Sequence, residues 1–402
     1  MTIACADCGT LQDLPALGPR SVATCPICRN RMEVRTGRNL VVAWICATGT
    51  FALLIPANIM PVMHVSMLGM TRESRIASGV RELWNHQWVI IAILVAVLVI
   101  ALPLLRFALL SVVLGLVRTG ARPRWLGKAF RWTLQLDAWA MPDVFLLGCA
   151  VGYSRIRANL PVTIEWGGIS IILAAVLCML TRATLDRRTV WRAIAPERSA
   201  PAEPSQVISC VACELVLPLE AHGRACPRCG LRLSARKPYA VIRTLALVIA
   251  GFVLYLPANV FPMSTDIQLG ERVPHRIVDG ISELFSAGLW PLGVLIFCTS
   301  IAIPLLKLAG LSWFTLSIWR RSGRALPFKT ATYRFIDEIG RWSCIDVFTI
   351  AVFLPLLQFD GLLTSQAAPG AVAFILVVVL TMWASRTFDP RLMWDAAASE
   401  DS

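Results

Sequence analysis

Charged residues are scarce in this chain: they make up 16% of its 402 residues, whereas hydrophobic residues make up 56%. So little charge excludes a soluble protein of this length, because much apolar surface would remain in contact with water. We therefore predict an integral membrane protein. The sequence also lacks a Walker A string for nucleotide phosphates and any nucleic-acid recognition motif. The sequence thus indicates neither ATP hydrolysis nor a DNA or RNA partner.

One pattern occurs twice along the chain. The string Pro-Ala-Asn-x-x-Pro begins at Pro56 and again at Pro257, and each copy follows a pair of Cys-x-x-Cys motifs. Other matched residues keep the same order, with two extra residues in the second copy: Glu82 and Glu283, Pro103 and Pro304, Trp139 and Trp342, Asp186 and Asp389. Colinearity of this kind predicts a tandem duplication.

Apolar segments long enough to cross a membrane as helices occur four times in each repeat. A helix of about 20 residues spans a ~30 Å hydrocarbon core. Such segments lie at 40–63, 88–117, 136–157 and 167–183, and again at 240–263, 289–319, 340–362 and 370–386. The fold class predicted is therefore an all-α polytopic membrane protein with two tandem four-helix modules.

Two basic loops, one after the second span of each module, contain no acidic residue. Their basic residues are Arg118, Arg122, Arg124, Lys128 and Arg131, and Arg320, Arg321, Arg324, Lys329 and Arg334. The positive-inside rule places both loops in the cytoplasm, together with the N-terminus, the central linker and the C-terminus. No cleavable signal peptide is expected, because the first 38 residues are polar and rich in cysteine.

Eight cysteines form two doubled Cys-x2-Cys sets of the zinc-ribbon type. The first set is Cys5, Cys8, Cys25 and Cys28, and the second is Cys210, Cys213, Cys226 and Cys229. Four converging thiolates match the tetrahedral preference of Zn²⁺, so we predict two structural zinc ions, one per set. Two alternatives are a thioredoxin-like redox pair and a rubredoxin-type iron site. The other cysteines lie in apolar segments and are interpreted as packing residues.

These boundaries divide the chain into five parts. Head 1 is a zinc ribbon at 1–36, module 1 is the membrane unit at 37–195, a linker occupies 196–204, head 2 is a zinc ribbon at 205–236, and module 2 is the membrane unit at 237–398. Between the first two spans of each module, 65–76 and 266–276 predict short β-hairpins around Gly69 and Gly270. The segments 76–84 and 277–285 that follow have apolar residues at helical spacing and predict interfacial amphipathic helices.

Ionisable residues inside the predicted spans are the candidate transport groups. Lys307 and Asp346 are predicted to pair in module 2, and Arg106 and Asp143 in module 1, because an isolated charge at that depth is costly. Around the first pair, Ser300, Ser343 and Thr381 complete a polar cluster. The competing interpretation is a buried pair that only fixes helix register.

Four features together are typical of one known family: the doubled ribbons, the Pro-Ala-Asn-x-x-Pro strings, Arg-Trp-Ser-Cys-Ile-Asp-Val-Phe at 341–348 and Phe-Asp-Pro-Arg-Leu-Met-Trp-Asp at 388–395. Through them the chain resembles the paraquat-inducible protein A family, including its LetA branch. Module 1 departs from the pattern: its Ala-Trp-Ala-Met-Pro-Asp-Val-Phe at 138–145 lacks the Arg and Ser, which favours module 2 as the functional one.

This resemblance implies a subunit of the Gram-negative inner membrane that passes lipid, phospholipid by expectation, to or from a periplasm-spanning MCE tunnel protein. It implies a transport component rather than an enzyme. If transport is driven, protonation of the cluster around Asp346 and Lys307 is the available device. The alternatives are a zinc-dependent membrane scaffold and a stress-response redox protein, neither of which would transport lipid.

Overall fold

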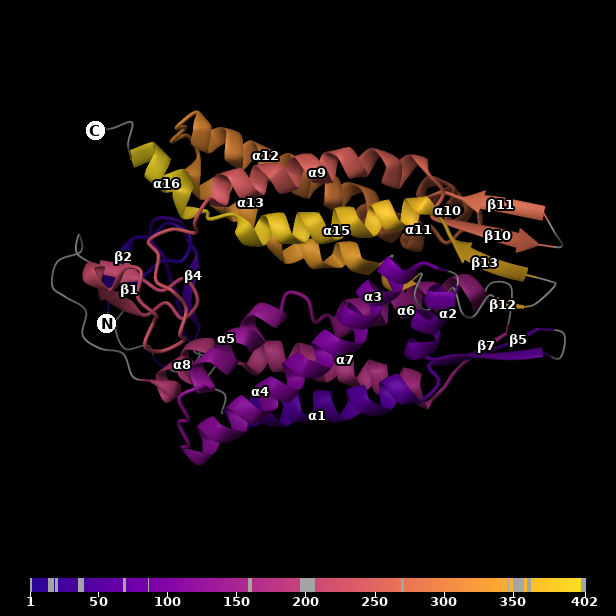
Figure 1. Cartoon of the computed structure of the whole chain (residues 1–402), viewed down its shortest axis with the longest axis horizontal. Coiled ribbons are helices and arrows are strands. Elements are labelled where there is room, and N and C mark those ends of the chain that lie inside the picture. Colours follow the sequence, from indigo (N-terminus) through magenta and orange to yellow (C-terminus); the bar gives the residue numbers. More distant parts are fainter. Residues whose placement is uncertain are drawn as a thin grey trace.

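The protein is described here from a computed structural model. The structure describes residues 2–13, 18, 21–34, 40–67, 70–85, 87–157, 161–195, 207–268, 271–345, 347–349, 358–359 and 363–398. Two elongated helical units lie alongside each other, with both cysteine-rich heads at one end and small β-sheets at the other (Figure 1). We refer to these as the head end and the sheet end.

Module 1 is built from long apolar helices and repeats as module 2. Its helices are α1 (Leu40–Ile59), α2 (Ile76–Asn85), α3 (Val89–Val95), the π-helical η1 (Ala96–Ala101), α4 (Leu102–Thr119), α5 (Leu126–Leu136), α6 (Pro142–Arg157), α7 (Trp166–Thr184) and α8 (Arg187–Ile194). Those of module 2 are α9 (Ala240–Val260), α10 (Ile277–Ser286), α11 (Trp290–Ile296), the π-helical η4 (Phe297–Ala302), α12 (Ile303–Trp319), α13 (Leu326–Ile339), the 3-10 turn η5 (Gly340–Cys344), α15 (Pro369–Thr387) and α16 (Arg391–Ala398).

Six helices of the described chain are long and apolar enough to cross a membrane. They are Leu40–Ile59, Val89–Thr119, Trp166–Thr184, Ala240–Val260, Trp290–Trp319 and Pro369–Thr387. They match six of the eight predicted spans. The helix corresponding to the third span, α6, has only 16 residues and begins at Pro142, because the chain turns between Leu136 and Pro142. Much of its counterpart, predicted at 340–362, lies outside the described residues.

The second span of each module contains a π-helical segment next to a proline. Pro103 follows η1 and Pro304 follows η4, each within the first turn of the next α-helix. Proline has no backbone N–H and cannot continue the i to i−4 ladder, and a π-bulge is one way in which a helix absorbs this defect. The duplicated sequence therefore builds the same irregularity twice.

Small sheets add strands to the predominantly helical modules. The predicted hairpins are confirmed as β5 (Met63–Met67) with β6 (Met70–Ser74) and β10 (Ser264–Gln268) with β11 (Glu271–His275). Each hairpin gains strands that were not predicted, giving the antiparallel orders β6-β5-β7 and β11-β10-β13-β12. The added strands are β7 (Val162–Ile164), β12 (Gln358–Phe359) and β13 (Leu363–Ala367). The predicted amphipathic segments form α2 and α10.

The modules pack together through α6 and the start of the segment that follows η5. Phe145 and Phe348 meet edge to face with ring centroids 5.7 Å apart. Beside them, the Thr349 hydroxyl donates to the carbonyl oxygen of Gly148 at 3.3 Å. A Cβ at Gly148 would lie 2.9 Å from that of Phe348, so only glycine allows this approach. A single hydrophobic cluster consequently runs through both modules.

Each head lies against the membrane module of the other repeat. Arg334 of α13 donates to the Asp7 carboxylate and to the Cys28 carbonyl of head 1, both at 3.2 Å. Head 2 packs on module 1, where Arg228 donates to the Ala195 carbonyl at 2.7 Å and its backbone lies directly over Gly127 of α5. The prediction of independent head-and-module units did not anticipate this exchange.

Candidate metal centres and membrane polar clusters

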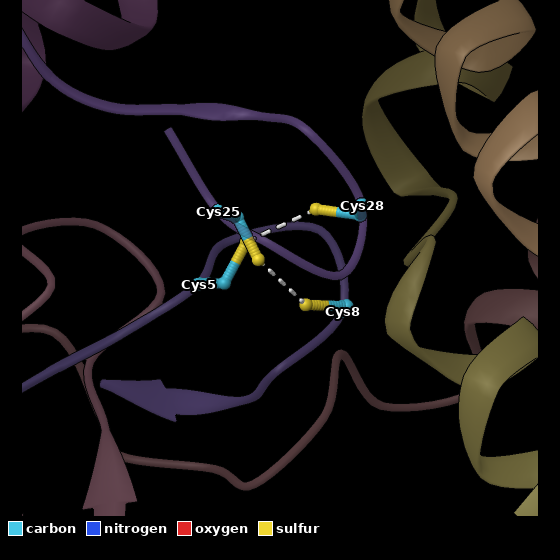
Figure 2. Close-up of side chains that lie close together, drawn as sticks. All are labelled: Cys5, Cys8, Cys25 and Cys28. Atoms are coloured by element: carbon cyan, nitrogen blue, oxygen red, sulfur yellow. Dashed lines mark hydrogen bonds between the residues drawn. The ribbon is translucent and has the colours of Figure 1, made fainter. Parts of the chain in front are cut away.

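The four cysteines of each head converge as predicted. In head 1 (β1, Thr2–Ala4; β2, Leu11–Asp13; β3, Val22–Thr24; β4, Arg31–Val34), Cys5 and Cys28 have Sγ atoms 3.4 Å apart, and Cys8 and Cys25 have theirs 3.6 Å apart (Figure 2). In head 2 (β8, Val207–Ser209; β9, Val216–Pro218), the pairs Cys210–Cys229 and Cys213–Cys226 lie at 3.5 and 3.6 Å.

Both clusters have the dimensions of a tetrahedral metal site. All four Sγ atoms of each set lie within 4.8 Å of one another, and all eight cysteines are buried. A tetrahedron with Zn–S bonds of about 2.3 Å has sulfur–sulfur edges of roughly 3.8 Å. The thiol donor set and its spacing therefore fit a tetrahedral metal ion such as Zn²⁺ without rearrangement.

Mutual hydrogen bonding among the thiols lowers the pKa of some and raises that of others, and the raised ones are Cys28, Cys213 and Cys229. Bonds from Cys28 and Cys5 lower the pKa of Cys8 to about 3. In head 2, the bond with Cys213 lowers the pKa of Cys210 to about 7, and bonds from Cys210, Cys213 and Cys229 lower the pKa of Cys226 strongly. A cation at the centre would stabilise the negative charge collected there.

Tight turns at the cysteines direct the thiols. Backbone N–H groups of Gly9 and Arg29 donate to the carbonyls of Cys5 and Cys25, and those of Glu214 and Gly230 donate to Cys210 and Cys226. The residues that close these turns have positive φ, at 77° for Gly9, 57° for Arg29, 57° for Glu214 and 69° for Gly230. Each Cys-x2-Cys motif thus forms a local turn, which we call a knuckle. Because the turn is local, the sequence alone locates the site.

The predicted polar residues of module 2 that the structure describes are buried, and they lie on elements that contact one another. Lys307 of α12 is 1% exposed and donates from Nζ to the carbonyl of Gly340 at 2.8 Å. Ser300, Ser343 and Thr381 are 0% exposed and lie on η4, η5 and α15, of which η5 contacts both other elements. Asp346, the predicted partner of Lys307, lies outside the described residues, so this pairing stays a prediction.

Two details distinguish the surroundings of Lys307. A Cβ at Gly340 would overlap the Lys307 Cε, so glycine there gives the ammonium access to the backbone. The Ser343 hydroxyl has no hydrogen-bond partner among the described residues. Thr381, in contrast, donates to the Val378 carbonyl at 3.0 Å, as intramembrane hydroxyls commonly do.

In module 1, the predicted Arg106–Asp143 pair is wrong. Arg106 instead forms an ion pair with Asp137, which follows α5, and Asp143 pairs with Arg182 of α7 at 2.5 Å. Arg182 also reaches Asp137 at 3.2 Å, and both arginines donate to the carbonyl of Ala140, at 3.4 and 3.3 Å. The turn between α5 and α6 brings Asp137 to Arg106, a position that a continuous third span would not allow.

Residues outside the sequence prediction therefore complete this network. Asp137 and Arg182 were overlooked because they lie at the ends of the apolar segments, where a solvated charge is ordinary. One signal is available in the alignment of the two repeats. Asp137 and Arg182 correspond to Gly340 and Ser385, so module 1 has charged residues at two positions where module 2 has none. The two modules thus differ in charge as well as in sequence.

Comparisons with known proteins give consistent results. The family model described as "Paraquat-inducible protein A" matches residues 40–195 and 241–398. "Intermembrane transport protein PqiA" of Escherichia coli (strain K12) is 31% identical over 409 residues, covering 98% of this chain and 95% of the relative. "Lipophilic envelope-spanning tunnel protein A" of the same organism is 28% identical, covering 98% and 91%. "Probable intermembrane transport protein" of Haemophilus influenzae is 23% identical, covering 97% and 95%. No solved structure matches the chain.

Proposed function

Because the chain belongs to the paraquat-inducible protein A family, we propose that it is a membrane subunit of an intermembrane transport system. The observation that carries this proposal is full-length similarity to relatives that are themselves named for transport between membranes or for an envelope-spanning tunnel. Six long apolar helices agree with a subunit embedded in one of those membranes. This is a transport role and requires no catalytic residue.

The cargo in this proposal is phospholipid, and the partner is a periplasm-spanning MCE tunnel protein. The bacterial relatives come from organisms with two membranes, and the present chain has six helices long and apolar enough to cross the inner one. The sheet end would face the periplasm and the partner. The heads, the basic loops and both termini would face the cytoplasm, in line with the positive-inside rule.

The two metal centres serve a structural role in this account, with zinc as the proposed ion. Buried tetrahedral thiol sets leave no open coordination position for a substrate, which is the usual property of structural sites. Bound zinc would hold the knuckles in place and thereby support the docking of each head on the opposite module.

Coupling of transport to protons would involve Lys307 and Asp346. A buried lysine is rare inside a membrane and marks a functional position by default. We expect Lys307→Met or Asp346→Leu alone to lower protein abundance, since each leaves a charge buried and unpaired at a cost of roughly several kcal/mol. The double variant removes both charges and should fold.

The test is transfer of labelled phospholipid from vesicles containing the protein to the purified MCE partner. The double variant should reach wild-type abundance but transfer little lipid. Thr315→Val is a matched control, because Thr315 is also buried in α12 but binds only the Leu311 carbonyl. Wild-type transfer by the double variant would show that the pair only fixes helix packing.

A further inference from the structure

A cavity of about 200 Å³ lies between the modules near the head end. Its walls come from module 1, through α4, α5 and the α7–α8 junction, and from module 2, through α13 and η5. It is far larger than the ~10–15 Å³ needed to hold one water molecule. The charged side chains that line this inter-module cavity are Arg106, Asp137, Arg182, Arg187, Glu338 and Arg341.

Positive charge predominates in the cavity. Four arginines face two acidic side chains, and Asp137 is shared by Arg106, Arg182 and Arg187. Asp143 forms an ion pair with Arg182 and neutralises part of this charge. Guanidinium groups still outnumber carboxylates when Asp143 is included. Glu338 binds Arg341 but its own side chain is 71% exposed, so water screens that pair.

Two of these guanidinium groups have a buried N–H without an acceptor. The Nε atoms of Arg106 and Arg341 are buried and have no hydrogen-bond partner among the described residues. Arg106 as a whole is 2% exposed. One arginine belongs to module 1 and the other to module 2. Because both arginines line the cavity, a ligand with several acceptor oxygens would bridge the modules through their guanidinium groups.

We propose that the inter-module cavity binds the phosphate of an anionic phospholipid. A phosphate diester carries its charge on two unesterified oxygens of a tetrahedral group, which suits arginine forks approaching from different elements. A carboxylate holds its two oxygens in one plane with its carbon, and Asp137 already supplies one such group. The cavity lies close to the C-terminal ends of α5 and α7.

This inference rests on the proposed transport function and names a position for its substrate. It also connects to the polar cluster of module 2, because Gly340, whose carbonyl accepts from Lys307, immediately precedes Arg341. A headgroup held at Arg341 would therefore be one residue away from the backbone that Lys307 binds. Free inorganic phosphate has the same chemistry, so an experiment must distinguish the two sources.

Arg341→Gln is the most informative variant. Its ion-pair partner Glu338 is largely solvated, so removing the guanidinium leaves no buried charge without a partner. Arg320→Gln is the matched control, because it removes an equal charge from an exposed position in the basic loop of module 2. Glu338→Gln makes the opposite change in charge, because it removes a carboxylate and should increase the positive excess at the cavity.

The measurement is native mass spectrometry of the full-length protein with phosphatidylglycerol, with dioleoylglycerol as the phosphate-free lipid. We expect Arg341→Gln to weaken phosphatidylglycerol retention about tenfold or more, Glu338→Gln to strengthen it, and Arg320→Gln to leave it unchanged. Retention of dioleoylglycerol should be the same in all four proteins. Equal phosphatidylglycerol retention by wild type and Arg341→Gln would overturn the site.

A second titration uses inorganic phosphate alone. Arg341-dependent binding of phosphate without retained phosphatidylglycerol would assign the cavity to a soluble anion and overturn the lipid source. The transfer assay keeps the two proposals separate. If the wild-type protein retained phosphatidylglycerol through Arg341 but transferred no lipid, the transport function would fail while the site would stand.

Discussion

At the scale of single residues, the cysteines decide whether a head can fold. Head 2 is short, and its buried apolar residues besides the four cysteines are Ile208, Leu215, Val216, Leu217 and Leu233. So few apolar side chains supply little burial energy, and metal binding would contribute most of the folding free energy. The same reasoning applies to head 1, where the cysteines cluster with Ile3 and Met32.

We therefore predict that Cys210→Ser lowers both metal content and protein abundance. Loss of one thiolate opens the tetrahedron and forfeits part of a binding free energy on the order of 10 kcal/mol. Elemental analysis of the purified protein should show about one zinc ion instead of two. Cys298→Ser is the control, because Cys298 lies in η4, away from both heads. A stable, active Cys210→Ser protein with undiminished abundance and no metal would contradict the structural role.

At the scale of elements, the heads hold the two modules together. Head 1 meets α13 through Arg334, and head 2 meets α5 and α8 through Arg228 and Glu214. Head 1 also contacts module 1, since Glu33 binds Arg192 at 3.0 Å. Head 2 also contacts module 2, since Arg236 donates to the Asp395 carboxylate of α16 at 2.6 Å. Each head therefore contacts both repeats, which favours movement of the modules as one assembly.

Gly127 offers a direct test of this docking. A Cβ there would overlap the carbonyl oxygen of Arg228, which is backbone and cannot swing aside as a side chain can. We expect Gly127→Ala to displace head 2 from α5, which should appear as faster protease cleavage of head 2. Gly152→Ala in α6 is the control, because no atom lies within 4 Å of its Cβ position. Identical cleavage of both variants would show that head 2 does not dock on α5.

At the scale of the whole molecule, orientation follows from the basic loops. The sequence predicts four spans in each module, which would return the chain to the side on which it began. Reporter fusions after residues 35, 205 and 402 should then all report the cytoplasm. A fusion at Ser74, in β6 at the sheet end, should report the periplasm. Disagreement between the fusions at 35 and 205 would show that module 1 does not have four spans.

How much of this structure the sequence predicts depends on how far apart the interacting residues lie along the chain. The cysteine clusters, the hairpins and the apolar helices are local, so spacing and periodicity locate them. The exchange of heads and the Arg106–Asp137 pair depend on how distant elements pack, and nothing in a single sequence specifies that Arg106 meets Asp137 rather than Asp143. The inter-module cavity is likewise a product of packing, since Arg341 reaches it from the other repeat.

The central claim is that this chain exchanges lipid with a tunnel partner. The most direct measurement counts phospholipid bound to the MCE partner purified from cells with and without the chain, by quantitative lipid mass spectrometry. The account predicts a change in occupancy: a decrease without the chain if it loads the tunnel, and an increase if it unloads the tunnel. Equal occupancy in the two preparations, with the partner at equal abundance, would contradict it.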